Sequence, residues 1–79
     1  MMMKKTTPIT GRRLYRVVND YTDEELFRAD TARDCLEWMR NEISSAGYSR
    51  LRCWVDKERG ITLYDIGWGI MRVEEINTN

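Results

Sequence analysis

One stretch decides the fold class of this chain: TARDCLEWMRNEISSAG, residues 31–47. Its apolar residues recur every three or four positions, which is the spacing of a helix that buries one face. Thr31 is placed to cap the first turn, Asp34 suits the positive end of a helix, and Gly47 is a natural residue to end one. We expect Trp38 at the edge of the core. The predicted buried face consists of Ala32, Cys35, Leu36, Met39, Ile43 and Ala46.

The segments on either side of this helix read as strands. Residues 13–19 and 25–29 are β-rich and flank a polar turn, so we expect an antiparallel hairpin. Residues 51–56 and 61–66 follow the helix as two more strands, and residues 70–76 either continue the fourth strand or form a fifth. The order ββαββ(β) predicts an α+β fold, a mostly antiparallel sheet of four or five strands with one helix packed on one face.

The length of 79 residues predicts a single small domain. We assign residues 1–10 to a disordered basic tail, residues 11–76 to the α+β domain and residues 77–79 to a polar tail. The 13 basic and 13 acidic side chains cancel, which argues against a protein that grips nucleic acid over its whole surface. The charged residues before Val17 are nevertheless all basic, and this segment forms either a solvated tail or an arm that binds an acidic partner or phosphate. The basic residues of this segment are Lys4, Lys5, Arg12, Arg13 and Arg16.

The residue types needed for catalysis are poorly represented. The chain has no histidine, the commonest general base at neutral pH. Cys35 and Cys53 lack C-x-x-C spacing and fall at positions predicted to face inward, so we expect two reduced, buried thiols. A disulfide between them is geometrically conceivable. We expect no enzyme, no catalytic residue, no metal site and no cofactor.

No apolar run approaches the roughly 18 residues of a membrane span. The N-terminal Met1-Met2-Met3-Lys4-Lys5 is not followed by the apolar stretch of a signal peptide. We therefore expect a soluble cytoplasmic protein with no membrane partner.

One helix covers one face of a sheet, so the opposite face is expected to be open. If Leu51, Cys53 and Val55 face the helix, then Arg52 and Trp54 face away. The same alternation turns Leu26 outward, and it turns Tyr64 outward if Leu63 faces the helix. The predicted partner-binding face comprises Arg16, Arg28, Arg52, Trp54, Tyr64 and Arg72.

Arginine, tryptophan and tyrosine are the residue types enriched at binding hot spots, which favours an interaction surface. The alternative is that these arginines lie across apolar neighbours and pair with acids on adjacent strands, such as Glu74 and Glu75.

Two further segments hold candidate contacts. The run Gly67-Trp68-Gly69 lacks the frame of a phosphate-binding loop, so its glycines are expected to permit a bend that exposes or tucks Trp68. The acidic turn with Asp20, Asp23 and Glu24 is either solvated or mimics phosphate charge toward a basic groove on a partner. Its spacing does not match a calcium loop.

We therefore expect a small protein-binding module that acts by steric or electrostatic occlusion. In size, architecture and the absence of an active site, the chain resembles accessory proteins of phages and mobile elements. Many of those, such as anti-CRISPR and other anti-defence proteins, bind and block one host protein. Two alternatives stay open. One is nucleic-acid binding, with bases stacked on the sheet face and the basic arm on phosphates. The other is a structural homodimer formed through the open face or an edge strand.

Overall fold

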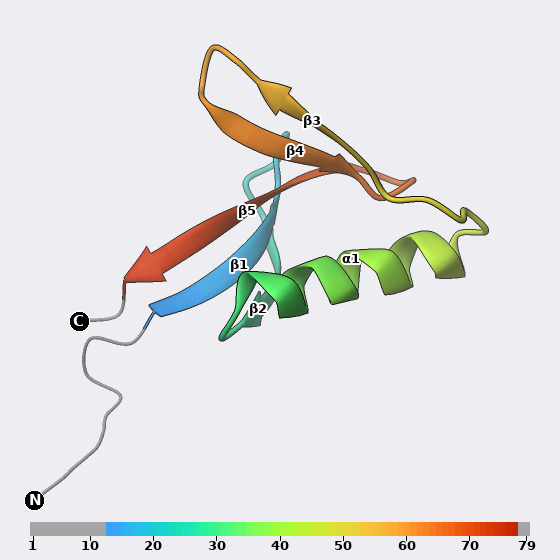
Figure 1. Ribbon diagram of the computed structural model, residues 1–79, viewed down its shortest axis with the longest axis horizontal. Coiled ribbons are helices and arrows are strands. Elements are labelled where there is room, and N and C mark those ends of the chain that lie inside the picture. Colours follow the sequence, from blue (N-terminus) through green and yellow to red (C-terminus); the bar gives the residue numbers. More distant parts are fainter. Residues whose placement is uncertain (1–12, 78–79) are drawn as a thin grey trace, which may run out of the picture.

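The structure, a computed structural model, describes residues 13–77 and shows one antiparallel sheet with one helix against it (Figure 1). The strand order is β2-β1-β5-β4-β3. This confirms the predicted α+β class and element order, and it makes residues 61–77 a hairpin of two strands. Residues 1–10, the predicted tail, lie outside the described residues, and the last strand continues to Asn77. The elements are β1 (Arg13–Asn19), β2 (Glu25–Ala29), α1 (Ala32–Ser45), β3 (Arg52–Asp56), β4 (Ile61–Asp65) and β5 (Ile70–Asn77).

Helix α1 begins and ends at the predicted signals. The Thr31 hydroxyl accepts a hydrogen bond from the backbone N–H of Asp34 at 3.1 Å, which satisfies one of the orphan amides of the first turn. At the other end Gly47 has a φ of 88°, a conformation that glycine adopts at little cost because it has no Cβ. The turn there lets the Tyr48 N–H donate to the Ile43 carbonyl at 2.8 Å, as in a Schellman motif. The chain therefore reverses sharply and returns toward the sheet.

The hydrophobic core lies between α1 and the sheet. Trp38 lies at the edge of this core, as predicted. Its ring stacks on that of Phe27, with ring centroids 5.5 Å apart. Ala32 and Ala46, which were predicted to belong to the buried stripe, are exposed because they sit at the two ends of the helix. The fully packed cluster consists of Cys35, Met39 and Ile43 from the helix and Val17, Ile66 and Met71 from the sheet side.

Helix α1 covers only part of the sheet. Within residues 13–77 its backbone approaches β1, β2 and β5 but neither β3 nor β4, so the β3–β4 hairpin extends beyond it (Figure 1). The predicted burial of Cys53 and Val55 is therefore wrong. Cys53 is exposed and Val55 is 59% exposed, although both lie on the helix side of the sheet. Both cysteines are free, and Cys35 is buried as predicted.

The strand register decides which side chains share a face. Tyr64 lies opposite Cys53 on β3 and opposite Met71 on β5, and Met71 belongs to the core, so Tyr64 faces the helix side. Leu63 lies opposite Trp54 and therefore faces away from the helix. The predicted orientation, with Leu63 inward and Tyr64 outward, is wrong.

Leu26 also departs from the predicted alternation. A β-bulge shifts the pairing of β1 with β2 between Val17 and Val18, and Leu26 is the extra residue. Its side chain packs against the core instead of facing away from the helix. A bulge depends on the pairing of two strands, so a pattern within one strand does not reveal it.

Candidate protein-interaction site

The sheet face turned away from the helix, which we call the outer face, carries a continuous ionic network. Each arginine in this network lies against carboxylates from its own strand, a neighbouring strand or a turn. The predicted alternative, pairing with acids on adjacent strands, is what the structure contains for Arg16, while Arg28 and Arg72 pair with acids of their own strands and, for Arg72, of the β1–β2 turn. In order, the network runs Asp56–Arg59–Asp20–Arg72–Glu74–Arg16–Glu25–Arg28, with Asp23 also bound to Arg72.

Arg72 stands at the centre of this network. Its guanidinium donates to Glu74 at 2.6 Å, to Asp23 at 2.7 Å and to Asp20 at 3.0 Å, and its side chain is only 16% exposed. These hydrogen bonds, the one to Glu74 first, raise the pKa of Arg72 above its usual range. The same contact is the main reason that the pKa of Glu74 is lowered. Arg72 is thus held in place by three acids and is not a free cation.

Asp20 joins two turns that are distant in sequence. Its carboxylate accepts from Arg59, in the β3–β4 turn, at 3.0 and 2.9 Å, and from Arg72 at 3.0 Å. Its side chain is 7% exposed, and the Arg59 contact is the main cause of its lowered pKa. Beside these ion pairs the outer-face residues Val18 and Leu63 are buried without any helix above them. We attribute their burial to the arginine stems and to the joined turns.

Arg16 and Arg28 lie directly opposite one another on β1 and β2, an arrangement that is unfavourable for like charges. Glu25 compensates it by binding Arg28 at 2.8 Å and Arg16 at 3.4 Å, and Glu74 binds Arg16 at 2.8 Å from the other side. The Glu25 pKa is lowered mainly by Arg28. This pair is therefore neutralised within the protein.

Arg52 and Trp54 occupy the free end of the predicted site, on edge strand β3. Arg52 binds Asp65 at 2.7 Å, which lowers the Asp65 pKa, yet its side chain remains 72% exposed. Trp54 is 42% exposed. Among the six predicted partner-binding residues, Arg52 is the most exposed arginine, Arg28 and Trp54 are also exposed, and Tyr64 lies on the opposite face.

The secondary candidates are placed differently from one another. Asp20 and Asp23 belong to the ionic network, while Glu24 is exposed in the same turn. Trp68 is exposed, and its indole N–H donates to Glu42 of the helix at 3.2 Å. Lys4, Lys5 and Arg12 lie outside the described residues, and Arg13 begins β1.

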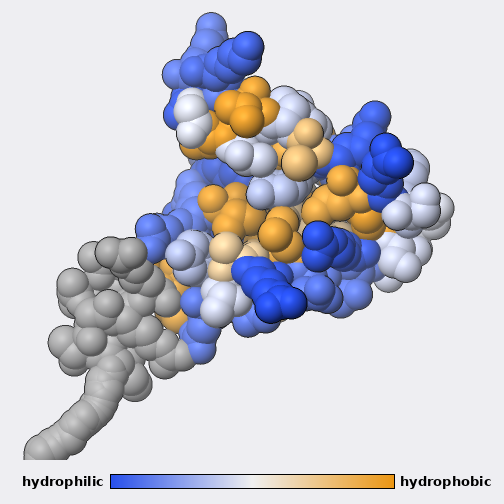
Figure 2. Space-filling view, viewed as in Figure 1, coloured by the Kyte–Doolittle hydropathy of each residue, from blue (hydrophilic) through white to orange (hydrophobic). Residues whose placement is uncertain are grey.

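An apolar surface on the helix side of the hairpin was not predicted. We call it the open face and define it by Cys53, Val55 and Tyr64, which the register places on one side of β3 and β4. Figure 2 shows apolar side chains continuing from the helix toward the hairpin. A helix about 10 Å across spans only two or three strands spaced about 4.8 Å apart. That geometry was available from the sequence and could have identified this uncovered surface.

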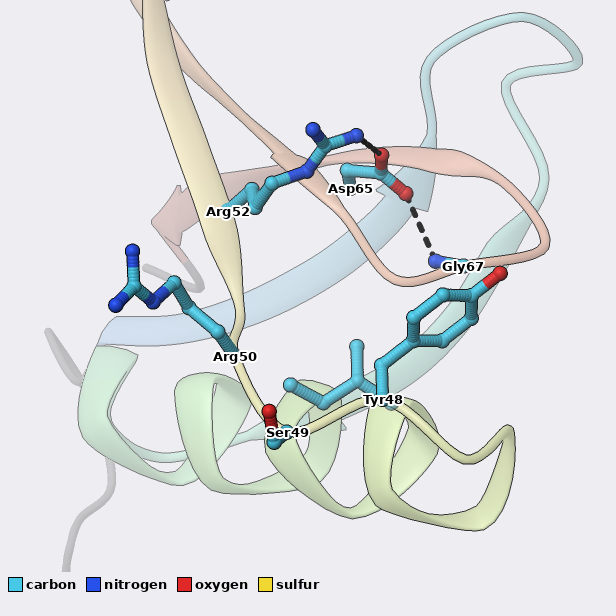
Figure 3. Close-up of a pocket in the computed structure, with 7 residues that line it drawn as sticks. Tyr48, Ser49, Arg50, Arg52, Asp65 and Gly67 are labelled. Atoms are coloured by element: carbon cyan, nitrogen blue, oxygen red, sulfur yellow. Dashed lines mark hydrogen bonds and ion pairs between the residues drawn. The ribbon is translucent and has the colours of Figure 1, made fainter.

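A pocket of about 410 Å³ adjoins the C-terminal end of α1. The Tyr48 ring stands over Gly67, whose N–H donates to Asp65 at 2.8 Å, and the side chains of Arg50 and Arg52 border the same space (Figure 3). The exposed ring of Tyr48 thus adds an aromatic surface beside two cations. The lining residues are Ile43, Tyr48, Ser49, Arg50, Arg52, Asp65 and Gly67.

Comparisons with protein-family models, with curated proteins and with solved structures find no match. Among residues 13–77, no helix has the length and apolar character needed to cross a membrane. The same part of the chain contains no cluster of three or more cysteine, aspartate and glutamate side chains placed to hold a metal ion.

Proposed function

We propose that this protein is a small, non-enzymatic binding module that captures another protein through the open face of its β3–β4 hairpin. The observation that carries the proposal is that α1 stops short of the hairpin. An apolar strand face is left without a cover, and Val55 is 59% exposed on it. Burying the part of the Val55 side chain that is still exposed is worth about 1–2 kcal/mol, which would contribute to the affinity for a partner that covers it.

The surroundings of the open face have the composition of a protein interface. Arg50 precedes β3, and Tyr48 and Trp68 expose their rings in the loops that follow α1 and β4. Interfaces combine an apolar centre with a polar rim and favour aromatic residues and arginine. A partner segment that runs along β3 from Val55 toward Arg50 would meet these side chains.

The ionic network favours a protein partner over nucleic acid. Nucleic-acid binding draws on cations that can meet phosphates. Arg16, Arg28 and Arg72 are each bound by carboxylates of this chain, and a phosphate would have to displace those partners. On the described part of the outer face these arginines, and Arg52 of β3 with Asp65, are therefore all paired with carboxylates of this chain.

The proposed mode of action is occlusion, in which the bound module covers a surface that its partner needs. The chain resembles phage and mobile-element accessory proteins in size and architecture, so bacterial host proteins are the first partners to test. An inhibitory role would follow from capture alone and would require no chemistry from the module.

The test compares Val55→Glu with the matched control Asn41→Glu, which adds the same charge at an exposed position of α1. Tagged wild type and both variants are used to capture proteins from a bacterial lysate, with and without nuclease treatment. We expect one protein to be retained by wild type and by Asn41→Glu and to be lost with Val55→Glu. Both variants should keep the far-ultraviolet circular dichroism of wild type, because both positions are exposed.

The proposal fails if capture is the same for all three proteins, or if nothing is retained. Retention that disappears after nuclease treatment would instead support nucleic-acid binding. A partner that passes this comparison should then bind purified wild type in calorimetry and bind Val55→Glu at least about tenfold more weakly, a difference of about 1.4 kcal/mol.

A further inference from the structure

We propose that β3 pairs with the β3 of a second copy of this chain, antiparallel and about a two-fold axis at Trp54. The two sheets would then form one continuous sheet. This contact uses the edge of the strand and its outer-face side chains, so it goes beyond the proposed capture of another protein by the open face.

The edge of β3 is available for pairing. β3 ends the strand order, and Arg52, Cys53, Trp54 and Val55 are all exposed. The Asp56 carbonyl accepts from the Gly60 N–H at 2.8 Å across the turn, so the backbone groups of Asp56 point toward β4. In an antiparallel pair, the backbone N–H and C=O groups of successive residues point to alternate edges of the strand.

It follows that the backbone N–H and C=O groups of Cys53 and Val55 point to the free edge. An exposed row of such groups is a ready template for another strand. Backbone geometry therefore permits two reciprocal hydrogen-bonded pairs between copies, with Cys53 facing Val55 of the second copy in each. Trp54 then lies between them at a non-hydrogen-bonded position, where opposing side chains are closest.

The strand sequence RCWVD is complementary to itself in this register. Arg52 faces Asp56 of the second copy, Cys53 faces Val55, and Trp54 faces Trp54. Centring on Trp54 is the register that pairs each β3 residue with another β3 residue. Opposite charges on facing positions and paired aromatic rings both stabilise neighbouring strands.

The charges already on the outer face extend this pairing. Arg52 binds Asp65 and Asp56 binds Arg59 within each copy, at 2.7 and 2.8 Å. Across the junction the signs would continue to alternate, from Asp65 through Arg52 to Asp56 of the second copy. The large exposed fraction of Arg52 leaves its guanidinium free to reach a second carboxylate.

The other edge strand, β2, lacks this property. Its sequence ELFRA, paired with itself about Phe27, would place Glu25 against Ala29 and Leu26 against Arg28. Leu26 is packed against the core, and Glu25 and Arg28 are bound to each other at 2.8 Å. The self-complementary pattern therefore singles out β3.

The contact is small, since five residues per copy bury less than the roughly 800 Å² per partner of a standard stable interface. We therefore expect a monomer–dimer equilibrium that depends on protein concentration. In the dimer the two open faces would lie side by side across the junction and double the surface offered to a partner.

Two charge reversals test the pairing by sedimentation velocity. In a dimer of Arg52→Asp the substituted position faces Asp56 of the second copy, so two negative charges meet. In a dimer of Asp56→Arg the substituted position faces Arg52 of the second copy, so two positive charges meet. Each variant alone should therefore associate at least about tenfold more weakly than wild type. An equimolar mixture of the two variants brings opposite charges together at both positions and should recover the association. Circular dichroism of each variant checks that the fold is intact.

A cross-link tests the register. In Cys53→Ser/Trp54→Cys the two new thiols face each other at a non-hydrogen-bonded position, with Cα atoms about 4.5 Å apart, and should oxidise to a disulfide-linked dimer. Wild type should not cross-link, because Cys53 faces Val55. A disulfide through Cys53 in wild type would indicate a register centred on Cys53 and would overturn the proposal.

The proposal is also overturned if wild type sediments as a monomer up to about 1 mM, or if the mixture of charge variants associates no better than either alone. These outcomes are separate from the lysate test. Arg52→Asp and Asp56→Arg change the outer face and leave the open-face residues untouched, so capture of another protein can succeed where self-pairing fails.

Discussion

Replacing Asp20 by asparagine tests whether the ionic network holds the outer face together. The substitution keeps the side-chain size and removes one negative charge. Asp20 is 7% exposed and accepts two hydrogen bonds from Arg59 and one, at 3.0 Å, from Arg72. Arg59 is about half exposed, so solvent screens its ion pair with Asp20 and the contact with Arg72 dominates. A hydrogen bond between charged groups is worth about 1.5–3 kcal/mol where water is largely excluded, and we expect Asp20→Asn to cost about 2 kcal/mol through Arg72.

Urea unfolding followed by tryptophan fluorescence measures this loss. A chain of this size has an m-value of about 1 kcal/mol/M, so the midpoint should fall by about 2 M. The matched control is Glu37→Gln, because Glu37 and Arg40 form a solvent-exposed pair at 3.7 Å. We expect the control to change stability by no more than about 0.5 kcal/mol.

Salt separates a shielded network from a surface attraction. The deficit of Asp20→Asn should persist in about 0.5 M NaCl, because screening acts mainly on exposed charges. A loss below about 0.5 kcal/mol, or a loss that vanishes in salt, would refute the view that burial of Asp20 and Arg72 makes the network structural.

Three further predictions concern stability and reactivity. The network carboxylates Asp20, Glu25, Asp56 and Glu74 have pKa values lowered mainly by their hydrogen bonds to arginines, so their contribution to stability is complete above the unfolded pKa of about 4 and is lost as the pH falls through the folded values. The urea midpoint should therefore drop between about pH 5 and about pH 2, and an unchanged midpoint would contradict this. Ellman's reagent should modify exposed Cys53 in the native protein. Cys35, whose pKa is raised by burial, should react only in denaturant. Rapid reaction of both thiols in the native protein would refute the packing of Cys35. Gly67→Ala should lower the free energy of unfolding by about 1–3 kcal/mol, because φ is 95° there and a Cβ would lie 2.7 Å from the Tyr48 ring; an unaltered melting curve would show that this ring moves aside freely.

Local patterns were sufficient for the elements and for the side of the sheet that the helix covers. The caps at Thr31 and Gly47 and the apolar stripe through Cys35, Met39 and Ile43 predicted a helix whose ends the structure reproduces. Strand positions followed from alternation in the same way. These signals are reliable because capping and helical spacing depend on residues within a few positions of each other.

Local alternation did not predict which side chains of β4 face the helix. Its sequence ITLYD places strongly apolar residues at alternate positions, which predicted Leu63 toward the helix. The register with β3 and β5 reverses this, because the outer face buries Leu63 beside the ionic network. Apolar residues lie on both faces of β4, so alternation alone could not decide which of them face the helix.

The candidate site was predicted in part. Arg52 and Trp54 were placed correctly on the exposed outer face, but the expected row of free arginines became an ionic network, because partners such as Asp20 and Arg59 are far apart in the chain and adjacent in space. The open face was missed, although the width of one helix against a sheet of four or five strands could have indicated it.

The sequence by itself determined the elements, their order and the α+β class, since these depend on local spacing and capping. The tertiary structure alone decided how far the helix reaches, which charges are neutralised and where Val55 remains exposed. Those features depend on which strands pair, in which register, and on which strands the helix packs against, and each of these is a relation between residues distant in sequence.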